Sequence, residues 1–143
     1  MADYLINGPI SPELIASRIS LRENRKDTGG HSVFLGQVRG DIIDGKEVEA
    51  IEYSAYNQMV NTEAERMISE IRNAYNDVLD VDLLHSVGIV KTGQISLFVM
   101  VSAGHRDHAI KACSQFVEML KKRLPVWKKE LFADDSHRWT ENR

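Results

Sequence analysis

The sequence predicts an α+β fold in which helices alternate with antiparallel strand pairs. Apolar residues alternate along residues 94–102, which is the period of a strand, and they recur every three or four positions in residues 58–76, which is the period of a helix. The expected order of elements is βαββαββα, followed by an extended tail. No repeat or linker divides the 143 residues, so we expect a single domain over residues 1–143.

The elements of the first half are marked by capping and turn residues. Residues 4–6 are typical of a short strand, and Ser11 is a good N-cap for a helix that ends near residue 21. A polar loop precedes a strand at residues 31–38, and an Asp-Gly turn precedes a strand at residues 48–53. We expect these two strands to pair as a hairpin.

The second half begins with the longest helix and a pair of strands. Asn57 is the expected cap of the helix at residues 58–76. Strands at residues 80–90 and 94–102 follow, joined by a turn at Gly93. Since one face of the second strand is fully apolar and the other is mixed, we expect this strand to be central in the sheet.

The last helix begins at His105-Arg106 and ends near Arg123, because Pro125 cannot lie inside it. Cys113 lies on the inward stripe of this helix, so we expect it to pack in the core and not to act as a nucleophile. The residues after the helix are expected to be extended.

Composition excludes several classes of protein. The net charge of −3 and the pI near 5.9 argue against a general nucleic-acid binder, which needs broad neutralisation of phosphates. The single cysteine allows no internal disulfide and no cysteine-based zinc site. The sequence has neither an apolar run of the ~18–20 residues that span a bilayer nor a signal peptide. We therefore expect a cytoplasmic protein that does not contact a membrane.

A basic segment contrasts with this acidic background. Residues 121–129 contain five cations around an apolar unit that includes Pro125 and Trp127. This composition is typical of an anion site with a fixed shape. A lysine near apolar groups also loses its proton more easily, which suits acid/base chemistry. The alternative is an ordinary helix end, because cations in a last helical turn complement the helix dipole.

The junction Gly104-His105-Arg106 is a second candidate for anion binding. Free N–H groups at a helix start favour anions, and Arg106 can hold a phosphate or carboxylate through two bonds. His105 titrates near neutrality. Alternatively, the glycine is an ordinary turn residue. His105 and His108 have a spacing that metals use, but no carboxylate or cysteine partner is evident, so we expect no metal.

Taken in order, several segments resemble those of a known family. They are residues 30–39, residues 51–56, His85 with Gly88, Gly93, residues 102–106, residues 121–130, and Trp139. The pattern resembles the large, catalytic subunit of molybdopterin synthase over residues 4–143. Its most specific part is Pro-x-Trp-Lys-Lys-Glu, with Lys128 seven positions after Lys121.

The resemblance implies a fold, an activity and a partner. The fold would be an α/β hammerhead with an attached antiparallel sheet. The activity would be conversion of cyclic pyranopterin monophosphate to molybdopterin, by installing two sulfurs as a dithiolene without any cofactor. The sulfur would arrive as a thiocarboxylate on the C-terminal Gly-Gly of a small ubiquitin-like subunit. The assembly would be a heterotetramer, with a central homodimer and one small subunit at each outer end.

The resemblance also implies roles for residues of one cationic pocket. Lys121 would lie nearest the thiocarboxylate carbon, and Lys128 would act beside it as a general acid/base or an anion clamp. The phosphate and pterin would be held by Arg39, His105 and Arg106. The other expected members are Gln37 and Val38 at the border, Phe34 as an apolar wall, Lys129 and Glu130 along the lining, and Arg143 from the neighbouring protomer. These roles require both ends of the last helix to reach one hollow beside Arg39.

Three departures from the family pattern affect these roles. Ser86 stands where a basic residue is frequent, Gln37 stands where a lysine is frequent, and Arg143 comes earlier than the last residue of many relatives. Two other functions use the same cations. One is a catalytically silent phosphate- or nucleotide-binding module, and the other is an interaction protein whose basic segment docks an acidic partner. Under both alternatives, replacing Lys121 by alanine would change the binding of the ligand or partner. No reaction would be lost, because the protein would catalyse none.

Overall fold

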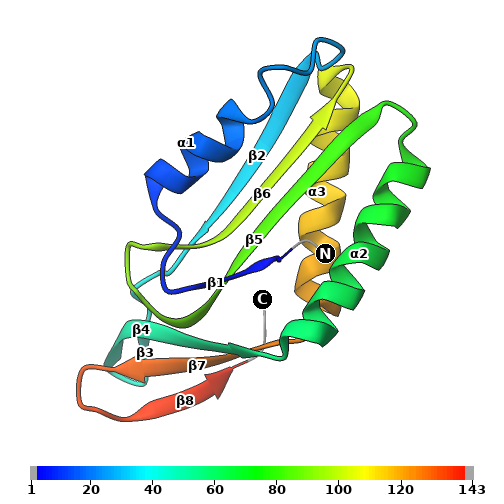
Figure 1. The fold of residues 1–143 in the computed structure, drawn as a ribbon. Coiled ribbons are helices and arrows are strands. Elements are labelled where there is room, and N and C mark those ends of the chain that lie inside the picture. The colour runs from blue at the N-terminus through cyan, green and yellow to red at the C-terminus, as the bar shows by residue number, and fades with distance from the viewer. Residues whose placement is uncertain (1–2, 141–143) are drawn as a thin grey trace.

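The computed structural model describes residues 3–140 and has the predicted α+β architecture, with helices packed on a mainly antiparallel sheet (Figure 1). The elements in chain order are β1 (Leu5–Asn7), α1 (Pro12–Ser20), β2 (Gly30–Gln37), β3 (Ile42–Ile43), β4 (Lys46–Ala55), α2 (Asn57–Ala74), β5 (Val78–Lys91), β6 (Ile95–Ala103), α3 (Arg106–Arg123), β7 (Val126–Phe132) and β8 (His137–Thr140). The predicted order lacked the two-residue strand β3. It also described the tail only as extended, whereas the tail forms the strands β7 and β8.

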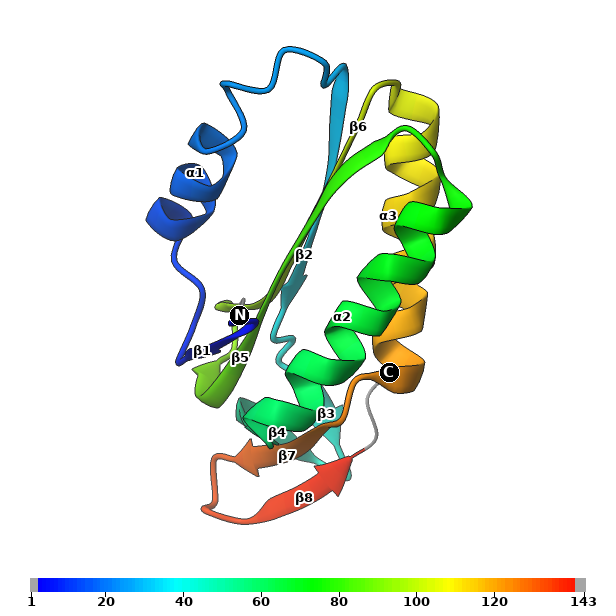
Figure 2. The same cartoon turned by 45° about the vertical axis from the view of Figure 1, so that its right-hand side comes forward.

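The strands form one sheet in the order β2-β6-β5-β4-β7-β8, and neighbours along this path are antiparallel. β1 adds to β5 in parallel, and β3 pairs with the start of β4. Because β6 lies between β2 and β5, the prediction of a central strand is confirmed. α2 and α3 cover one face of the long strands, and α1 covers the other face (Figure 2).

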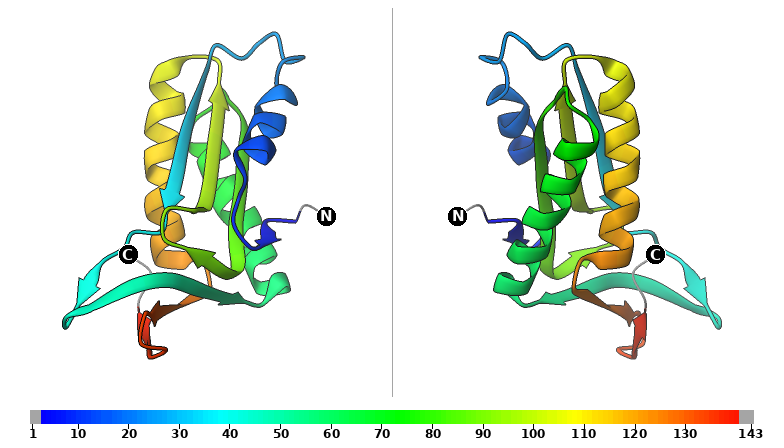
Figure 3. Two further views of the ribbon diagram at one scale, coloured as in Figure 1. Left: turned by 90° about the vertical axis from the view of Figure 1, so that its left-hand side faces the viewer. Right: turned by 90° about the vertical axis from the view of Figure 1, so that its right-hand side faces the viewer.

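β5 connects the two parts of the sheet. Its residues 78–85 pair with β6, and its residues 88–91 pair with β4. Gly88 has a φ of +83°, and a Cβ at this position would lie 2.8 Å from the Asn7 Oδ1 atom, so glycine is required here. β4, β7 and β8 run across the lower end of the long strands (Figure 3). Because β5 pairs first with β6 and then with β4, the long strands and the lower strands meet at the C-terminal end of α3.

The main core lies between the sheet and the helices α2 and α3. Val60 and Met67 of α2 and Phe116 and Leu120 of α3 are at most 2% exposed. Full burial of one large apolar side chain stabilises a fold by about 1.5–3 kcal/mol. Cys113 is buried in the same core, as predicted. This packing fixes where the C-terminal end of α3 lies relative to the sheet.

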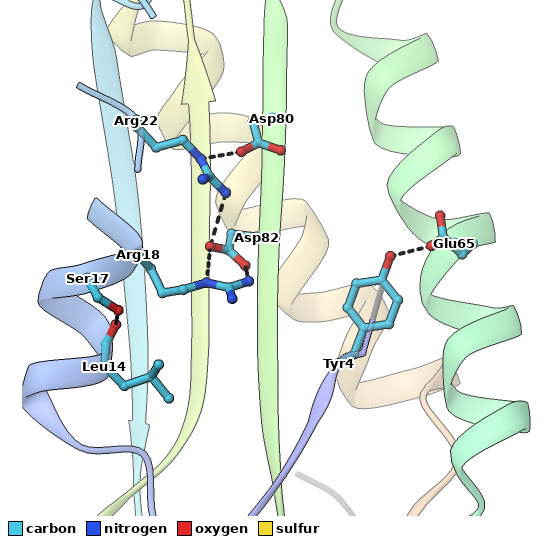
Figure 4. Close-up of polar contacts among 8 residues, drawn as sticks. All are labelled: Tyr4, Leu14, Ser17, Arg18, Arg22, Glu65, Asp80 and Asp82. Carbon is cyan, nitrogen blue, oxygen red and sulfur yellow. Dashed lines mark hydrogen bonds and ion pairs between the residues drawn. The ribbon is translucent and has the colours of Figure 1, made fainter. Parts of the chain in front are cut away.

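α1 covers its face of the sheet without complete burial of any of its nine residues. Arg18 binds both carboxylate oxygens of Asp82, and Arg22 binds Asp80 and Asp82 (Figure 4). These ion pairs supplement a small apolar cluster on the same face. The predicted N-cap is confirmed, because the Ser11 Oγ atom accepts a hydrogen bond of 3.1 Å from a backbone N–H of the first turn.

Two details of the sequence prediction are wrong. The strand at residues 31–38 does not pair with the strand at residues 48–53, because β2 pairs with β6 while β4 pairs with β5 and β7. The Asp-Gly turn instead closes a short hairpin of β3 and β4, with positive φ at both turn residues. Asn57 is the first residue of α2 and not its cap, which is Tyr56.

Other sequence signals agree with the structure. Gly93 has a φ of +87° in the turn between β5 and β6, and α3 ends at Arg123, just before Pro125. Among the described residues, no helix combines the length and the apolar character needed to cross a bilayer.

Candidate active site

A hollow of about 360 Å³ lies at the C-terminal end of α3, where the long strands meet the lower strands. It is lined by Phe34, Leu35, Gly36, Gln37, Val38, Arg39, Asp41, Ile51, Tyr53, His85, Ser96, Leu97, Leu120, Lys121, Leu124, Lys128, Glu130 and Thr140. The structure thus brings together seven of the residues that the sequence assigns to the pocket. These are Phe34, Gln37, Val38, Arg39, Lys121, Lys128 and Glu130.

The three cations in the last turn of α3 lie in different surroundings. Lys121 lines the hollow, whereas Lys122 is exposed. The Arg123 side chain binds two carboxylates of α2, with its Nε and Nη2 atoms 2.7 Å from Glu63 and Glu70 respectively. Burial lowers the pKa of the Lys121 ammonium below its ordinary value, and the Glu118 carboxylate offsets part of this effect. Of this group, only Lys121 is therefore suited to chemistry in the hollow.

Strand alternation divides the basic residues of β7 between two faces. Lys128 and Glu130 share one face and line the hollow. The Glu130 side chain is buried and accepts a hydrogen bond of 3.0 Å from the Nε atom of Arg138, whose Nη2 atom forms an ion pair with it at 2.9 Å. Lys129 points the other way, 3.1 Å from Glu52. The expectation that Lys129 lines the hollow is wrong, because adjacent strand residues face opposite sides.

Arg39 and Phe34 mark the mouth of the hollow, next to Gln37 and Val38. The Arg39 side chain is 85% exposed, and its Nε atom lies 2.6 Å from the Asp41 carboxylate. Phe34 is also exposed and supplies an apolar surface on β2. An exposed guanidinium beside an apolar wall suits a ligand that has both a flat ring and an anionic group.

The floor contains polar residues to which the sequence analysis gave no role. The buried Tyr53 hydroxyl donates a hydrogen bond of 3.0 Å to the Ser96 hydroxyl. His85 packs edge-on against the Tyr53 ring, with 5.1 Å between centroids. Alternation places Tyr53 and Ile51 on one face of β4, but only the strand pairing brings that face toward β5 and β6. The sequence pattern included His85 without indicating where it would lie.

The N-terminal end of α3 lies far from the hollow. His105 and Arg106 are exposed there, and an 18-residue helix is about 27 Å long. The expectation that both ends of the helix reach one hollow is therefore wrong within a single chain. A straight helix cannot fold its two ends together. Arg143 lies outside the described residues.

Asp77 is the carboxylate partner that the sequence analysis did not find at this distal end. It accepts hydrogen bonds from the His105 backbone N–H at 3.2 Å and from the His108 Nδ1 atom at 2.5 Å. The bond from His108 is the main cause that lowers the pKa of the Asp77 carboxyl. Within residues 3–140, no group of three or more histidine, cysteine, aspartate or glutamate side chains is arranged to hold a metal ion. The two hydrogen bonds that Asp77 accepts indicate that its carboxylate stabilises the start of α3.

The chain is similar to known proteins over most of its length. The model of the MoaE protein family matches residues 5–123. The chain belongs to the MoaE family. The molybdopterin synthase catalytic subunit of Pyrococcus abyssi is 39% identical to it over 114 residues, which cover 80% of this chain and 75% of the relative. The subunit of the same name from Drosophila willistoni is 38% identical over 116 residues, covering 80% of this chain but only 31% of the relative.

Solved structures have the same fold as this MoaE-family chain. Molybdopterin synthase from Staphylococcus aureus superposes with a TM-score of 0.84 at 26% identity, covering 98% of both chains. A chain from the complex of subunits 1 and 2 of the molybdopterin-converting factor of Helicobacter pylori has a TM-score of 0.81 at 22% identity, covering 97% of this chain and 90% of that chain. The latter likeness shows the fold alone. Family membership and fold class therefore agree with the resemblance found in the sequence.

Proposed function

We propose that this MoaE-family chain is the catalytic subunit of a molybdopterin synthase. It would convert cyclic pyranopterin monophosphate to molybdopterin, taking sulfur from the C-terminal thiocarboxylate of a small ubiquitin-like subunit. The observation that supports this most directly is that Lys121 and Lys128 line one hollow whose mouth holds Arg39. They come from α3 and β7, so the tertiary fold and not local sequence brings them together.

The reaction requires two anions to approach each other, namely the substrate phosphate and the thiocarboxylate of the carrier. Two like charges 4 Å apart repel by about 4 kcal/mol at an effective dielectric constant of 20. Cations fixed in the hollow remove this penalty without reorganising during the reaction. The exposed Arg39 fork suits the phosphate, and Phe34 suits the flat pterin.

The two lysines would divide the remaining work. Lys121 would stabilise the charge that develops on the acyl group, while its lowered pKa makes it a better proton donor than an exposed lysine. Lys128 would act beside it as an anion clamp or a second acid/base. The Arg138 guanidinium holds the Glu130 carboxylate, so this carboxylate does not cancel the positive charge of the hollow.

His105 and Arg106 enter this proposal only through a second copy of the chain. Because the start of α3 lies about 27 Å from its end, these two groups would contact a bound substrate only across a homodimer. A contribution of Arg143 from the neighbouring protomer rests on the resemblance alone. A dimer with an outer carrier subunit on each side is the heterotetramer expected from the resemblance.

Reconstitution tests the proposal. The purified chain is mixed with its thiocarboxylated carrier subunit and cyclic pyranopterin monophosphate, and dithiolene product is measured. The proposal requires that product forms. Absence of product would exclude the enzyme hypothesis and favour a binding module or a docking protein. Mixing inactive Lys121→Ala chains with inactive Arg106→Ala chains must restore some activity if each site uses both copies. Failure to restore activity would exclude the contribution of Arg106 from a second copy.

A further inference from the structure

The floor of the hollow contains a histidine that the proposed function does not use. His85 of β5 is 6% exposed and lines the hollow. Its backbone N–H donates to the Tyr4 carbonyl over 2.8 Å, and its register with Leu5 fixes β5 against β1. The position of the ring is therefore determined by strand pairing and not by a mobile loop.

The contacts of the His85 ring assign its tautomer. Nδ1 lies 2.8 Å from the backbone carbonyl oxygen of Ser86. A carbonyl only accepts hydrogen bonds, so Nδ1 carries the proton and Nε2 carries the lone pair. The Tyr53 ring packs against the imidazole at an interplanar angle of 80° and limits its rotation. The imidazole of His85 is therefore neutral, and its hydrogen-bond acceptor is the Nε2 atom.

The charges around His85 favour this neutral form. The charged groups that line the hollow with it are Lys121 from α3, Lys128 and Glu130 from β7, and Arg39 and Asp41 after β2. Arginines already hold both carboxylates. Burial is the main cause that lowers the pKa of His85 to about 4, and the two lysines act in the same direction. His85 is therefore an acceptor that adds no negative charge to a hollow built for anions.

We propose that the Nε2 atom of His85 transfers the proton of the water that releases the carrier subunit from the sulfurated pterin. This rests on the proposed function, in which the thiocarboxylate sulfur bonds to the substrate and leaves an acyl group joined to the pterin through that sulfur. A carboxylate in this position would repel the incoming anions, whereas a neutral imidazole does not.

The step balances without an oxidant or reductant. The water oxygen bonds to the acyl carbon, and one water proton passes to Nε2. The carbon–sulfur bond breaks with its electron pair on sulfur, which takes the proton from Nε2. The products are the carboxylic acid of the carrier, which ionises and releases its proton to solvent, and a thiol on the pterin. Because nearby cations disfavour the imidazolium, the ring returns its proton readily to the sulfur.

Two substitutions separate proton transfer from a structural role. His85→Asn keeps an N–H on the Ser86 side and removes the Nε2 acceptor. His85→Gln places an amide near the Nε2 position but cannot take up a proton. If the ring only held the Ser86 carbonyl, His85→Asn would be as active as the wild type and only His85→Gln would be impaired.

Both variants are expected to lower kcat about 100-fold, which is within the usual range for a general acid/base, with KM changed by less than about threefold. Mass spectrometry of the reconstituted complex must then show a carrier–pterin adduct that accumulates in the variants and not in the wild type. Wild-type rates in His85→Asn, or a slow variant without adduct, would overturn the inference. If His85→Asn does not fold, the adduct measurement on His85→Gln tests the inference: a slow variant that accumulates the adduct supports it, and a slow variant without the adduct overturns it. Absence of product with the wild type would instead refute the proposed function.

Discussion

The two ends of α3 have equally suitable residues for an anion, yet only one of them lies at the hollow. The N-terminal end exposes His105 and Arg106, and the Asp77 carboxylate binds the helix start. The C-terminal end places Lys121 beside Lys128 of another element. Local chemistry that suits an anion is common along a sequence. A site forms where a second element packs against it and limits access of water.

The second element at the C-terminal end is β7. Pro125 ends the helix, and β7 then pairs with β4 across the lower end of the sheet. This path returns Lys128 to the hollow seven positions after Lys121. At the distal end, the strand that packs against the helix start is β2, where Gly30 lies beside Arg106 and has no side chain to add to a site. Four predictions test this contrast, from the largest expected effect to the smallest.

Lys121→Ala should reduce the rate of dithiolene formation by about 10²–10³-fold, because it removes a charge aimed at the reacting acyl group. Its matched control is Lys122→Ala, which removes the same charge from the adjacent exposed position. Single-turnover kinetics give the rates, and calorimetry gives the affinity for the carrier subunit, which should be retained in both variants. Equal effects of the two substitutions would mean that only net charge matters at this end of α3.

Lys128→Ala and Lys129→Ala form a second matched pair on one strand. The first removes a cation from the hollow and should slow the reaction about 10–100-fold. The second removes an ion pair with Glu52 on the opposite face, which is worth at most about 1 kcal/mol of stability. Steady-state rates of the two variants provide the comparison. A larger rate loss in Lys129→Ala would contradict the division of β7 into two faces.

His85 should make the stability of the protein depend on pH under mildly acidic conditions. Its pKa is about 4 in the folded chain and 6.5 in the absence of the fold, so the unfolded chain binds more protons between these values. Stability therefore falls as the pH is lowered from 6.5 toward 4, by about 2 kcal/mol at about pH 5. Urea unfolding at several pH values should show a smaller fall in His85→Gln, which does not titrate. Parallel pH curves would contradict the buried neutral ring.

Asp77→Ala should have the smallest effect of the four, and its effect on structure should be limited to the N-terminal end of α3. The substitution removes the acceptors for the His105 N–H and the His108 ring, so the first turn of α3 should exchange its amide hydrogens faster. Because the pKa of the Asp77 carboxyl is lowered from 3.8, its contribution to stability is lost only as the pH falls below that value. Hydrogen exchange followed by mass spectrometry should leave the last turn, near Lys121, unchanged. Faster exchange at both ends would contradict their independence.

Local signals in the sequence predicted most of the elements, because capping and turn residues act within a few positions. Ser11, Gly93 and Pro125 each mark a boundary that the structure confirms. Strand pairing was not predictable in this way. β2 pairs with β6, which lies more than fifty residues later, and the hydrophobic pattern of a strand does not specify its neighbour.

The same limit applies to the candidate site. Resemblance to a family supplied Lys121, Lys128 and Arg39, which the fold brings together at one hollow. It also supplied Arg106, which a straight helix places at the other end of the molecule. Tyr53 and His85 were not assigned, because their role depends on how β4 and β5 meet at the floor. Residue type indicates what a side chain can do, but only packing determines what it contacts.

The ion pair at the mouth of the hollow has a consequence for turnover. Arg39 already holds the Asp41 carboxylate through its Nε and Nη2 atoms, at 2.6 and 3.4 Å. These contacts use two of the five N–H donors of the guanidinium, so three donors remain for a second anion. In the proposed reaction, a phosphate would bind these donors while the Asp41 carboxylate keeps the other side of the group. Asp41 would thus hold the Arg39 side chain in one orientation as substrate enters and product leaves, which lowers the entropy cost of binding.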